Sequence, residues 1–216
     1  MRRTDPPEEV TVAVRAIVFD LGGVLERVEE FEETLGAAWR ARLEMSPEEF
    51  AASLAAIDPG KLAETGQMNE AEYAARCATC LRLSPAQQEE FISDMWDWYC
   101  GELDEELMAF AASLRPRVRT AIVSNSADGA RREELSRYAF DEIFDPIIYS
   151  HEVGLAKPDP AIFELACSRL DVAPAETIFV DDVPGHCEAA RQIGMHAIQH
   201  RSTPQTITAI TALLTG

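Results

Sequence analysis

Residues 16–25 read AIVFDLGGVL, and this stretch decides how the rest of the chain is interpreted. A run of apolar residues ends at one carboxylate, Asp20, and Gly22 and Gly23 follow. A continuous apolar run bounded by a glycine turn is typical of a strand buried on both faces, as in a parallel sheet. Ligands of open parallel sheets bind beyond the carboxyl ends of the strands. Asp20 is therefore predicted either at the lip of a ligand crevice or simply as the acidic end of a strand.

The pattern after residue 113 predicts strands that alternate with helices. Strands are expected over residues 11–19, 119–123, 147–149, 177–180 and 196–199, and helices over residues 128–138, 159–170, 183–193 and from 203 onward. Such alternation is typical of parallel βαβ units with right-handed crossovers. The predicted fold class is therefore α/β, with a Rossmann-like parallel sheet as its core.

The segment between the first two strands has the signals of helices and lacks those of strands. Ser46, Asn69 and Ser84 each stand three residues before a Glu or Gln, which is the capping-box pattern of a helix start. We therefore predict an all-helical cap domain over residues 26–113, inserted into a core made of residues 10–25 and 114–216. Residues 1–9 are predicted to be a polar N-terminal tail.

Composition narrows the classes of function. The 216 residues contain 19 Lys and Arg against 38 Asp and Glu, a formal net charge of −19. This balance argues against nucleic acid or an anionic membrane as a partner. The chain start has no apolar segment of signal-peptide type, and no apolar run reaches transmembrane length, so we expect a cytoplasmic protein. The five cysteines are odd in number and irregularly spaced, and the pair Cys77 and Cys80 is expected to pack in a helix rather than to bind zinc.

Polar residues follow three of the predicted strands directly. These are Asp20, Ser124, and the pair Asp181 and Asp182, while Lys157 lies in a loop that opens a helix. If the strands are neighbours, these groups converge on one crevice, where several carboxylates would repel one another. A divalent cation with oxygen ligands, such as Mg²⁺, would neutralise them. In that setting Asp20 could act as a nucleophile toward phosphorus.

These motifs resemble those of the haloacid dehalogenase-like (HAD) superfamily, in the subgroup with a helical cap after the first motif. The resemblance covers nearly the whole chain and includes FDLGGV from Phe19, VSN ending at Asn125, SHEVGLAKP around Lys157, and FVDD ending at Asp182. It implies that Asp20 is the nucleophile, that Lys157 stabilises the transferring group, and that Ser124 and Asn125 bind phosphate. It also implies a Mg²⁺ site; its ligands would be Asp20, the carbonyl of Gly22, and Asp182, with Asp181 as a direct or indirect helper.

Two positions depart from the family pattern. Most phosphatases of the superfamily have a second Asp two residues after the nucleophile, as a general acid and base, and here that position is Gly22. Some members with Gly at this position resemble sugar-phosphate phosphatases, and sugar 1-phosphates or acyl phosphates need the acid less because their leaving groups are better. His186 replaces the Asp or Asn often found four residues after Asp182. For His186 and for His151 both a role at the site and a purely structural role remain open.

The resemblance implies that the cap closes over the crevice and contacts the part of the substrate that is not phosphate. The cap residues considered for this contact, or else for ordinary packing, are Trp39, Arg40, Arg42, Arg76, Trp96 and Trp98.

The leading prediction is a Mg²⁺-dependent phosphatase that acts on a small phosphorylated metabolite, with the oligomeric state left open. A 2-haloacid dehalogenase is an alternative on the same fold, but it would leave the pair Asp181 and Asp182 without a cation. A non-catalytic module that binds a phosphorylated ligand is a second alternative, favoured by Gly22. A response-regulator receiver domain is a third, which the late position of the acidic pair disfavours.

Overall fold

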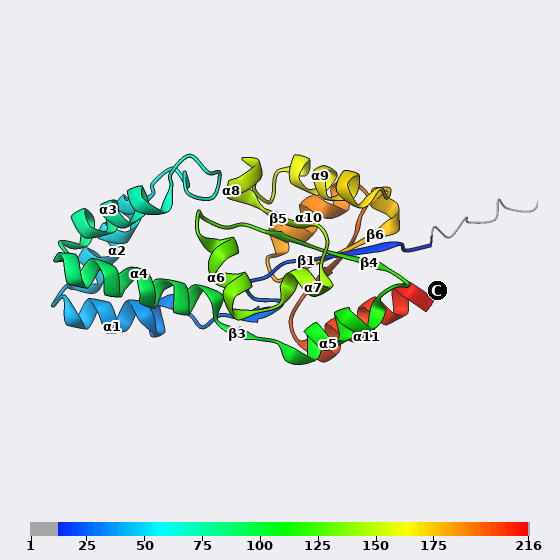
Figure 1. Cartoon of the computed structure of the whole chain (residues 1–216), viewed down its shortest axis with the longest axis horizontal. Coiled ribbons are helices and arrows are strands. Elements are labelled where there is room, and N and C mark those ends of the chain that lie inside the picture. Colours follow the sequence, from blue (N-terminus) through cyan, green and yellow to red (C-terminus); the bar gives the residue numbers. More distant parts are fainter. Residues whose placement is uncertain (1–12, 216) are drawn as a thin grey trace, which may run out of the picture.

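A five-stranded parallel sheet forms the centre of the computed structural model, which describes residues 13–215 (Figure 1). The strand order is β5-β4-β1-β6-β7, so that β1 lies in the middle and Phe19 is opposite both Ile122 and Val180. The α/β fold class predicted from the sequence is confirmed. The strands are β1 (Ala16–Phe19), β4 (Arg119–Ser124), β5 (Ile147–Tyr149), β6 (Thr177–Asp181) and β7 (His196–Gln199).

Helices cover both faces of this sheet, which explains why its strands are continuously apolar. Ile17 and Phe19 point into one layer, and Val18 points into the other. The first layer contains α5 (Glu105–Leu114), α6 (Ala130–Arg137), α7 (Phe140–Ile143) and α11 (Thr203–Thr215), and the second contains α9 (Pro160–Leu170) and α10 (Pro184–Gln192). The short helix α8 (Ser150–Val153) follows β5, and the 3₁₀ turn η2 (Pro174–Glu176) precedes β6.

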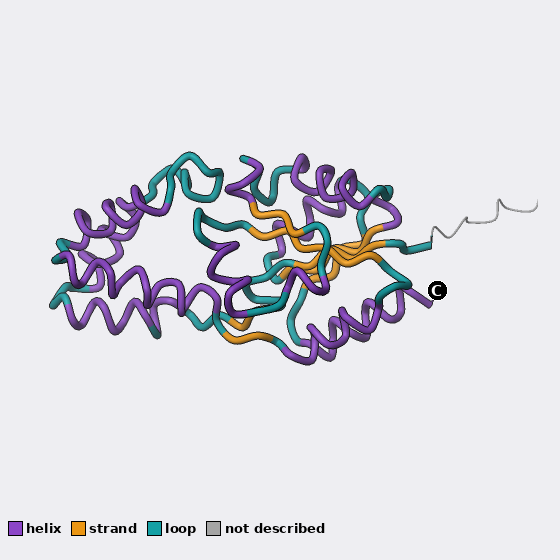
Figure 2. Tube along the Cα trace, in the orientation of Figure 1, coloured by secondary structure: helices purple, strands orange, loops and turns teal. Residues whose placement is uncertain are grey.

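The inserted helices form a separate layer with a hydrophobic core of its own (Figure 2). They are η1 (Phe31–Glu33), α1 (Leu35–Arg42), α2 (Pro47–Ile57), α3 (Glu70–Leu81) and α4 (Pro85–Cys100). The predicted capping boxes are present at Ser46, Asn69 and Ser84, where each side chain accepts a hydrogen bond from the backbone of the third helical residue. Cys77 of the Cys-x-x-Cys pair is buried in this core, and all five cysteines are free thiols.

Two short strands connect the cap helices to the core. β2 (Glu26–Arg27) pairs antiparallel with β3 (Glu102–Leu103), so the chain leaves and re-enters the core side by side. Helix α5, which the sequence analysis included in the cap segment 26–113, packs against α11 and buries Leu107 and Ala111 in the layer beneath β1. From its contacts with α11 we propose that α5 belongs with the core and that the cap begins after β2.

Other boundaries also differ from those predicted. The first strand begins at Ala16 rather than at residue 11, and residues 11 and 12, like the tail 1–9, lie outside the described residues. The helix predicted over residues 128–138 is shorter, because Gly129 with a positive φ precedes its first turn. Among residues 13–215, no helix is both long and apolar enough to cross a bilayer.

Candidate active site

The carboxyl ends of three adjacent strands bring the predicted polar groups together. Asp20 follows β1, while Ser124 and Asp181 end β4 and β6, which flank β1 on its two sides. Lys157 reaches the same place from the loop between α8 and α9, and its side chain is fully buried. The convergence expected from the sequence is therefore present in the structure.

Lys157 forms ion pairs with two carboxylates at once. Its Nζ lies 2.7 Å from Asp20 Oδ1 and 2.8 Å from Asp181 Oδ2. Although burial lowers the pKa of Lys157, the two carboxylates raise it overall, so the ammonium stays charged. Burial is the main reason that the pKa of Asp20 rises to about 7, against the opposing effect of Lys157.

The two oxygens of Asp20 have different surroundings. Oδ1 accepts hydrogen bonds from Lys157 Nζ and, at 2.8 Å, from the backbone N–H of Leu21. These contacts hold the carboxylate through Oδ1, whereas Oδ2 has no hydrogen-bond partner among the described residues, and Asp20 lines a pocket together with Ser124 and Asn125. An oriented carboxylate with one oxygen left for a substrate or an ion is suited to nucleophilic attack.

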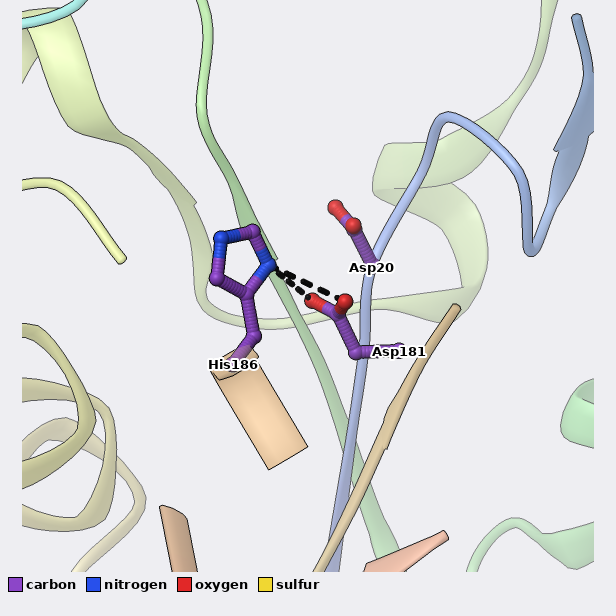
Figure 3. A group of neighbouring side chains, drawn as sticks. All are labelled: Asp20, Asp181 and His186. Carbon is purple, nitrogen blue, oxygen red and sulfur yellow. Dashed lines mark hydrogen bonds and ion pairs between the residues drawn. The ribbon is translucent and has the colours of Figure 1, made fainter. Parts of the chain in front are cut away.

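Asp181 is occupied by protein groups. Its Oδ1 lies 3.0 Å from His186 Nδ1 (Figure 3). The same oxygen accepts from the backbone N–H of Val183 at 2.8 Å, and Oδ2 pairs with Lys157. Burial raises the pKa of Asp181, but the contacts with His186 and Lys157 outweigh it and lower the pKa to about 2. Asp181 thus positions Lys157 and His186, and His186, whose role the sequence left open, is a direct partner of this carboxylate.

Asp182 lies against the glycine turn after Asp20. A Cβ built on Gly23, whose φ is +77°, would come within 2.6 Å of Asp182 Oδ2. Only glycine allows this approach, which places the half-exposed carboxylate of Asp182 against the turn that follows the buried Asp20. Burial and the neighbouring Asp181 raise the pKa of Asp182, as expected where carboxylates are crowded. Gly22 is exposed on the same turn.

The loop after β4 holds the far side of the site. Asn125 exchanges two hydrogen bonds with the backbone of Lys157, at 2.8 Å and 2.9 Å, and so fixes the loop that carries the lysine. His151 contacts Ser126 Oγ through Nδ1 at 2.9 Å, and Ser126 is the residue that follows Asn125. His151 therefore supports the loop and does not reach Asp20.

A pocket of about 380 Å³ opens above these groups. Its floor is formed by the residues predicted from the sequence, and its walls include side chains that the sequence analysis did not select. Those wall residues are Val28, Glu29, Glu30, Phe31 and Tyr99. Tyr99 and Phe31 belong to the cap side, and they have no sequence signal beyond their aromatic character.

The six cap residues considered from the sequence divide into two groups. Trp98 lines the site pocket, and both Trp96 and Trp98 line an adjoining cavity in the cap. The other four lie on α1 and α3 and do not line either cavity. The Trp39 indole donates to Asp94, and Arg42 stacks on the Trp39 ring. Arg76 donates to the carbonyl of Ile57, and Arg40 follows Trp39 in α1.

Among known proteins, two similar relatives catalyse different reactions. The chain is 35% identical over 95 residues to phosphoserine phosphatase of Thermus thermophilus, covering 43% of this chain and 38% of that protein. It is 34% identical over 80 residues to (S)-2-haloacid dehalogenase 1 of Pseudomonas sp., covering 37% of this chain and 35% of that protein. The matched segments thus span well under half of these relatives.

Solved structures match over much more of the chain. A HAD-like family hydrolase from Porphyromonas gingivalis superposes with a TM-score of 0.75 at 26% identity, covering 94% of this chain and 98% of that one. A HAD family enzyme from Bacteroides thetaiotaomicron, solved with magnesium and inorganic phosphate, gives a TM-score of 0.74 at 20% identity, covering 88% and 95%. Residues 14–194 match the haloacid dehalogenase-like hydrolase family, and because this match covers most of the chain, the chain belongs to that family.

Proposed function

We propose that the protein is a Mg²⁺-dependent phosphatase that uses Asp20 as its nucleophile. The observation that carries the proposal is the asymmetry of the Asp20 carboxylate. Lys157 and a backbone N–H hold one oxygen, and the other oxygen is left for the phosphorus of a substrate. The phosphoserine phosphatase relative and the neighbour solved with magnesium and phosphate support the same chemistry.

The residues around Asp20 fit a magnesium ion. Asp20 and Asp182 supply carboxylate oxygens, and the exposed Gly22 supplies its carbonyl, which is the all-oxygen set that Mg²⁺ prefers. The close approach of Asp182 to Gly23 brings this carboxylate, which follows β6, against the turn that follows Asp20 and β1. When bound, the ion would offset the negative charge of the carboxylates and of the phosphate. Asp181, which is saturated by Lys157 and His186, would act by positioning.

The reaction would proceed in two displacements. Asp20 Oδ2 attacks phosphorus, forming an aspartyl-phosphate as the bond from phosphorus to the leaving oxygen breaks. Lys157, Ser124 and Asn125 lie around the place where the transferred group would sit, and they would stabilise the charge on its oxygens. A water molecule then attacks the same phosphorus, which releases phosphate and restores Asp20.

Gly22 bears on the choice of substrate. A general acid at this position typically contributes about 10²–10⁴-fold in rate. A substrate whose leaving group departs as a stable anion loses less from the missing acid than a simple alkyl phosphate does. We therefore expect turnover to favour substrates with good leaving groups. We also propose that the protein is cytoplasmic.

Phosphate release tests the proposal directly. Purified protein would be assayed with acetyl phosphate, aryl phosphates and sugar phosphates, with Mg²⁺ and with EDTA. Asp20→Asn keeps the shape of the side chain, and Asp141→Asn, on the exposed surface of α7, serves as the matched control. We expect Mg²⁺-dependent turnover that Asp20→Asn abolishes and Asp141→Asn leaves intact. Turnover that persists in Asp20→Asn would exclude Asp20 as the nucleophile.

The dehalogenase relative makes a second activity worth testing in the same preparation. A dehalogenase would attack carbon with Asp20 and release halide without a metal ion. Asp181 raises the pKa of both Asp20 and Asp182, and this crowding of carboxylates favours the metal-dependent reaction. Chloride release from 2-chloropropionate in EDTA would support the dehalogenase, and phosphate release only with Mg²⁺ would support the phosphatase.

A further inference from the structure

A second cavity, of about 350 Å³, lies in the cap next to the site pocket. The two share the side chains of Phe31, Trp98, Tyr99 and Asn125, so the second cavity begins where the first ends. Asn125 holds the Lys157 loop, which places the entrance of the cap cavity beside the groups that would bind phosphate. A molecule whose phosphate lies at Asp20 can therefore extend its organic part into the cap.

The wall of the cap cavity is mainly aromatic and aliphatic. The side chains that form it, on α2, α3, α4 and the segments before them, are Phe31, Leu54, Met68, Tyr73, Phe91, Ile92, Met95, Trp96, Trp98 and Tyr99. Flat aromatic rings together with polarisable methionine sulfur are suited to a flat apolar group.

The indole N–H groups of this wall already have partners within the protein. The Trp96 indole donates to Glu70 Oε1 at 2.9 Å, and Glu70 is also paired with Arg132. The Trp98 indole donates to the carbonyl of Glu29 at 2.8 Å. Both tryptophans therefore present ring surface rather than a free donor to the cavity.

The acidic and amide groups at the rim are likewise in use. Asp58 accepts from the backbone N–H groups of Leu62 and Ala63, and Asn69 caps α3. The remaining polar lining residues also have partners: Asp128 accepts from the N–H of Glu70, Glu64 pairs with the exposed Lys61, and Ser126 contacts His151. A sugar would bring several hydroxyl groups that need partners when they are buried, and such groups cost free energy if they are left unpaired. The cavity is therefore better matched to an apolar ring than to a sugar.

We propose that the substrates are phosphate monoesters of phenols, with the ring in the cap cavity, and this inference rests on the proposed phosphatase activity. Gly22 points the same way independently of the cavity. A phenol has a pKa of about 10, whereas an aliphatic alcohol is nearly as weak an acid as water, with a pKa of about 16. As Asp20 Oδ2 bonds to phosphorus, the phosphorus–oxygen bond to the ring breaks. A phenolate then departs with the electron pair and takes its proton from water, so no general acid is needed.

Four substrates separate the contribution of the ring from that of the leaving group. Benzyl phosphate and glucose 6-phosphate both release a primary alkoxide and differ in the organic part, whereas phenyl phosphate differs from benzyl phosphate mainly in its leaving group. We expect kcat/KM for benzyl phosphate to exceed that for glucose 6-phosphate by at least about 10-fold, because burying a ring gives this much affinity. We expect phenyl phosphate to be faster still. Acetyl phosphate, too small to reach the cap cavity, reports whether the phosphatase reaction occurs at all.

Binding tests the cavity without turnover. Benzylphosphonate and methylphosphonate would be titrated calorimetrically into the protein with Mg²⁺, and we expect benzylphosphonate to bind at least about 10-fold more tightly. Met95→Gln puts a polar group of similar length into the wall, and Met45→Gln makes the same change at a half-buried cap position that does not line the cavity. The preference for benzylphosphonate should fall in Met95→Gln and persist in Met45→Gln.

The two sets of results distinguish the proposals. Equal affinity for the two phosphonates, or glucose 6-phosphate as the better substrate, would overturn the aromatic preference even if acetyl phosphate is hydrolysed. Failure to hydrolyse acetyl phosphate, together with tight and Met95-dependent binding of benzylphosphonate, would overturn the phosphatase proposal and leave the ring-binding cavity established.

Discussion

Two buried glutamates beneath the site make stability depend on pH in a specific direction. Glu26 on β2 is 1% exposed and Glu134 on α6 is fully buried, and each has one carboxyl oxygen without a hydrogen-bond partner among the described residues. The other oxygen of Glu134 accepts from the Tyr149 hydroxyl. Burial, and then repulsion by Glu134, raise the pKa of Glu26 to about 10, and burial is also the main reason that the pKa of Glu134 rises to about 8.

The sign of the effect follows from these raised values. In the unfolded chain a glutamate has a pKa near 4.5, so above that pH the folded state holds a proton that the unfolded state has lost. The free energy of unfolding is therefore highest below the unfolded pKa and falls as the pH rises toward the folded pKa. Each retained proton changes it by about 1.4 kcal/mol per pH unit, so Glu26 alone accounts for about 2–3 kcal/mol between pH 6 and pH 8.

Glu26→Gln removes this titration while keeping the shape of the side chain. We expect urea unfolding of the wild-type protein to show a loss of stability from pH 6 to pH 8, and the variant to lose about 2–3 kcal/mol less over the same range. Glu89→Gln, on the exposed face of α4, is the matched control and should follow the wild-type profile. Parallel profiles for the wild type and Glu26→Gln would refute the reasoning, since they would mean that Glu26 is ionised in the folded protein.

Three further predictions concern the glycine turn and the cap. Gly23→Ala combines a positive φ with a Cβ 2.6 Å from Asp182, so we expect the Mg²⁺ concentration for half-maximal activity to rise about 10–100-fold, measured by metal titration. A Cβ at Gly22 would meet only Val28, at 3.9 Å, so the backbone there accepts a side chain, and we expect Gly22→Asp to raise turnover of alkyl phosphates about 10²-fold with little change for acetyl phosphate. Ser84→Ala removes the cap of α4 and should lower stability by about 1 kcal/mol in thermal unfolding, with little change in KM for acetyl phosphate.

The elements of the fold that depend on local sequence were predictable, whereas the contacts between distant parts of the chain were not. The apolar runs of β1 and β6 and the capping boxes lie within a few residues of sequence, so each can be read directly. The pairing of Glu26 with Leu103 joins residues far apart in the chain, and two-residue strands have no periodicity to detect. The helical character predicted for residues 26–113 includes α5 but does not indicate what α5 packs against, because an apolar helix face does not say which surface it covers.

The floor of the site was predictable for a topological reason. Residues that follow adjacent parallel strands must meet at one edge of the sheet, so Asp20, Ser124 and Asp181 converge once the strand order is known. The walls depend on how the cap folds back over that edge. Tyr99 lies near the end of α4, and the pairing of β3 with β2 holds this end of the helix beside the pocket. The residues around Tyr99 in the sequence do not indicate that pairing.

The way in which the carboxylates share Lys157 indicates that the site requires a further positive charge. Lys157 is the buried cation of the cluster, and it is shared between Asp20 and Asp181 at 2.7 Å and 2.8 Å. A cation shared by two carboxylates cannot by itself also offset the charge of an incoming phosphate, and Asp182, against the turn after Asp20, adds a further negative charge to the site. A phosphate dianion would therefore approach a net negative surface unless another cation intervened. The tight pairing of Lys157 is thus itself a reason to expect that activity depends on Mg²⁺ rather than being merely enhanced by it.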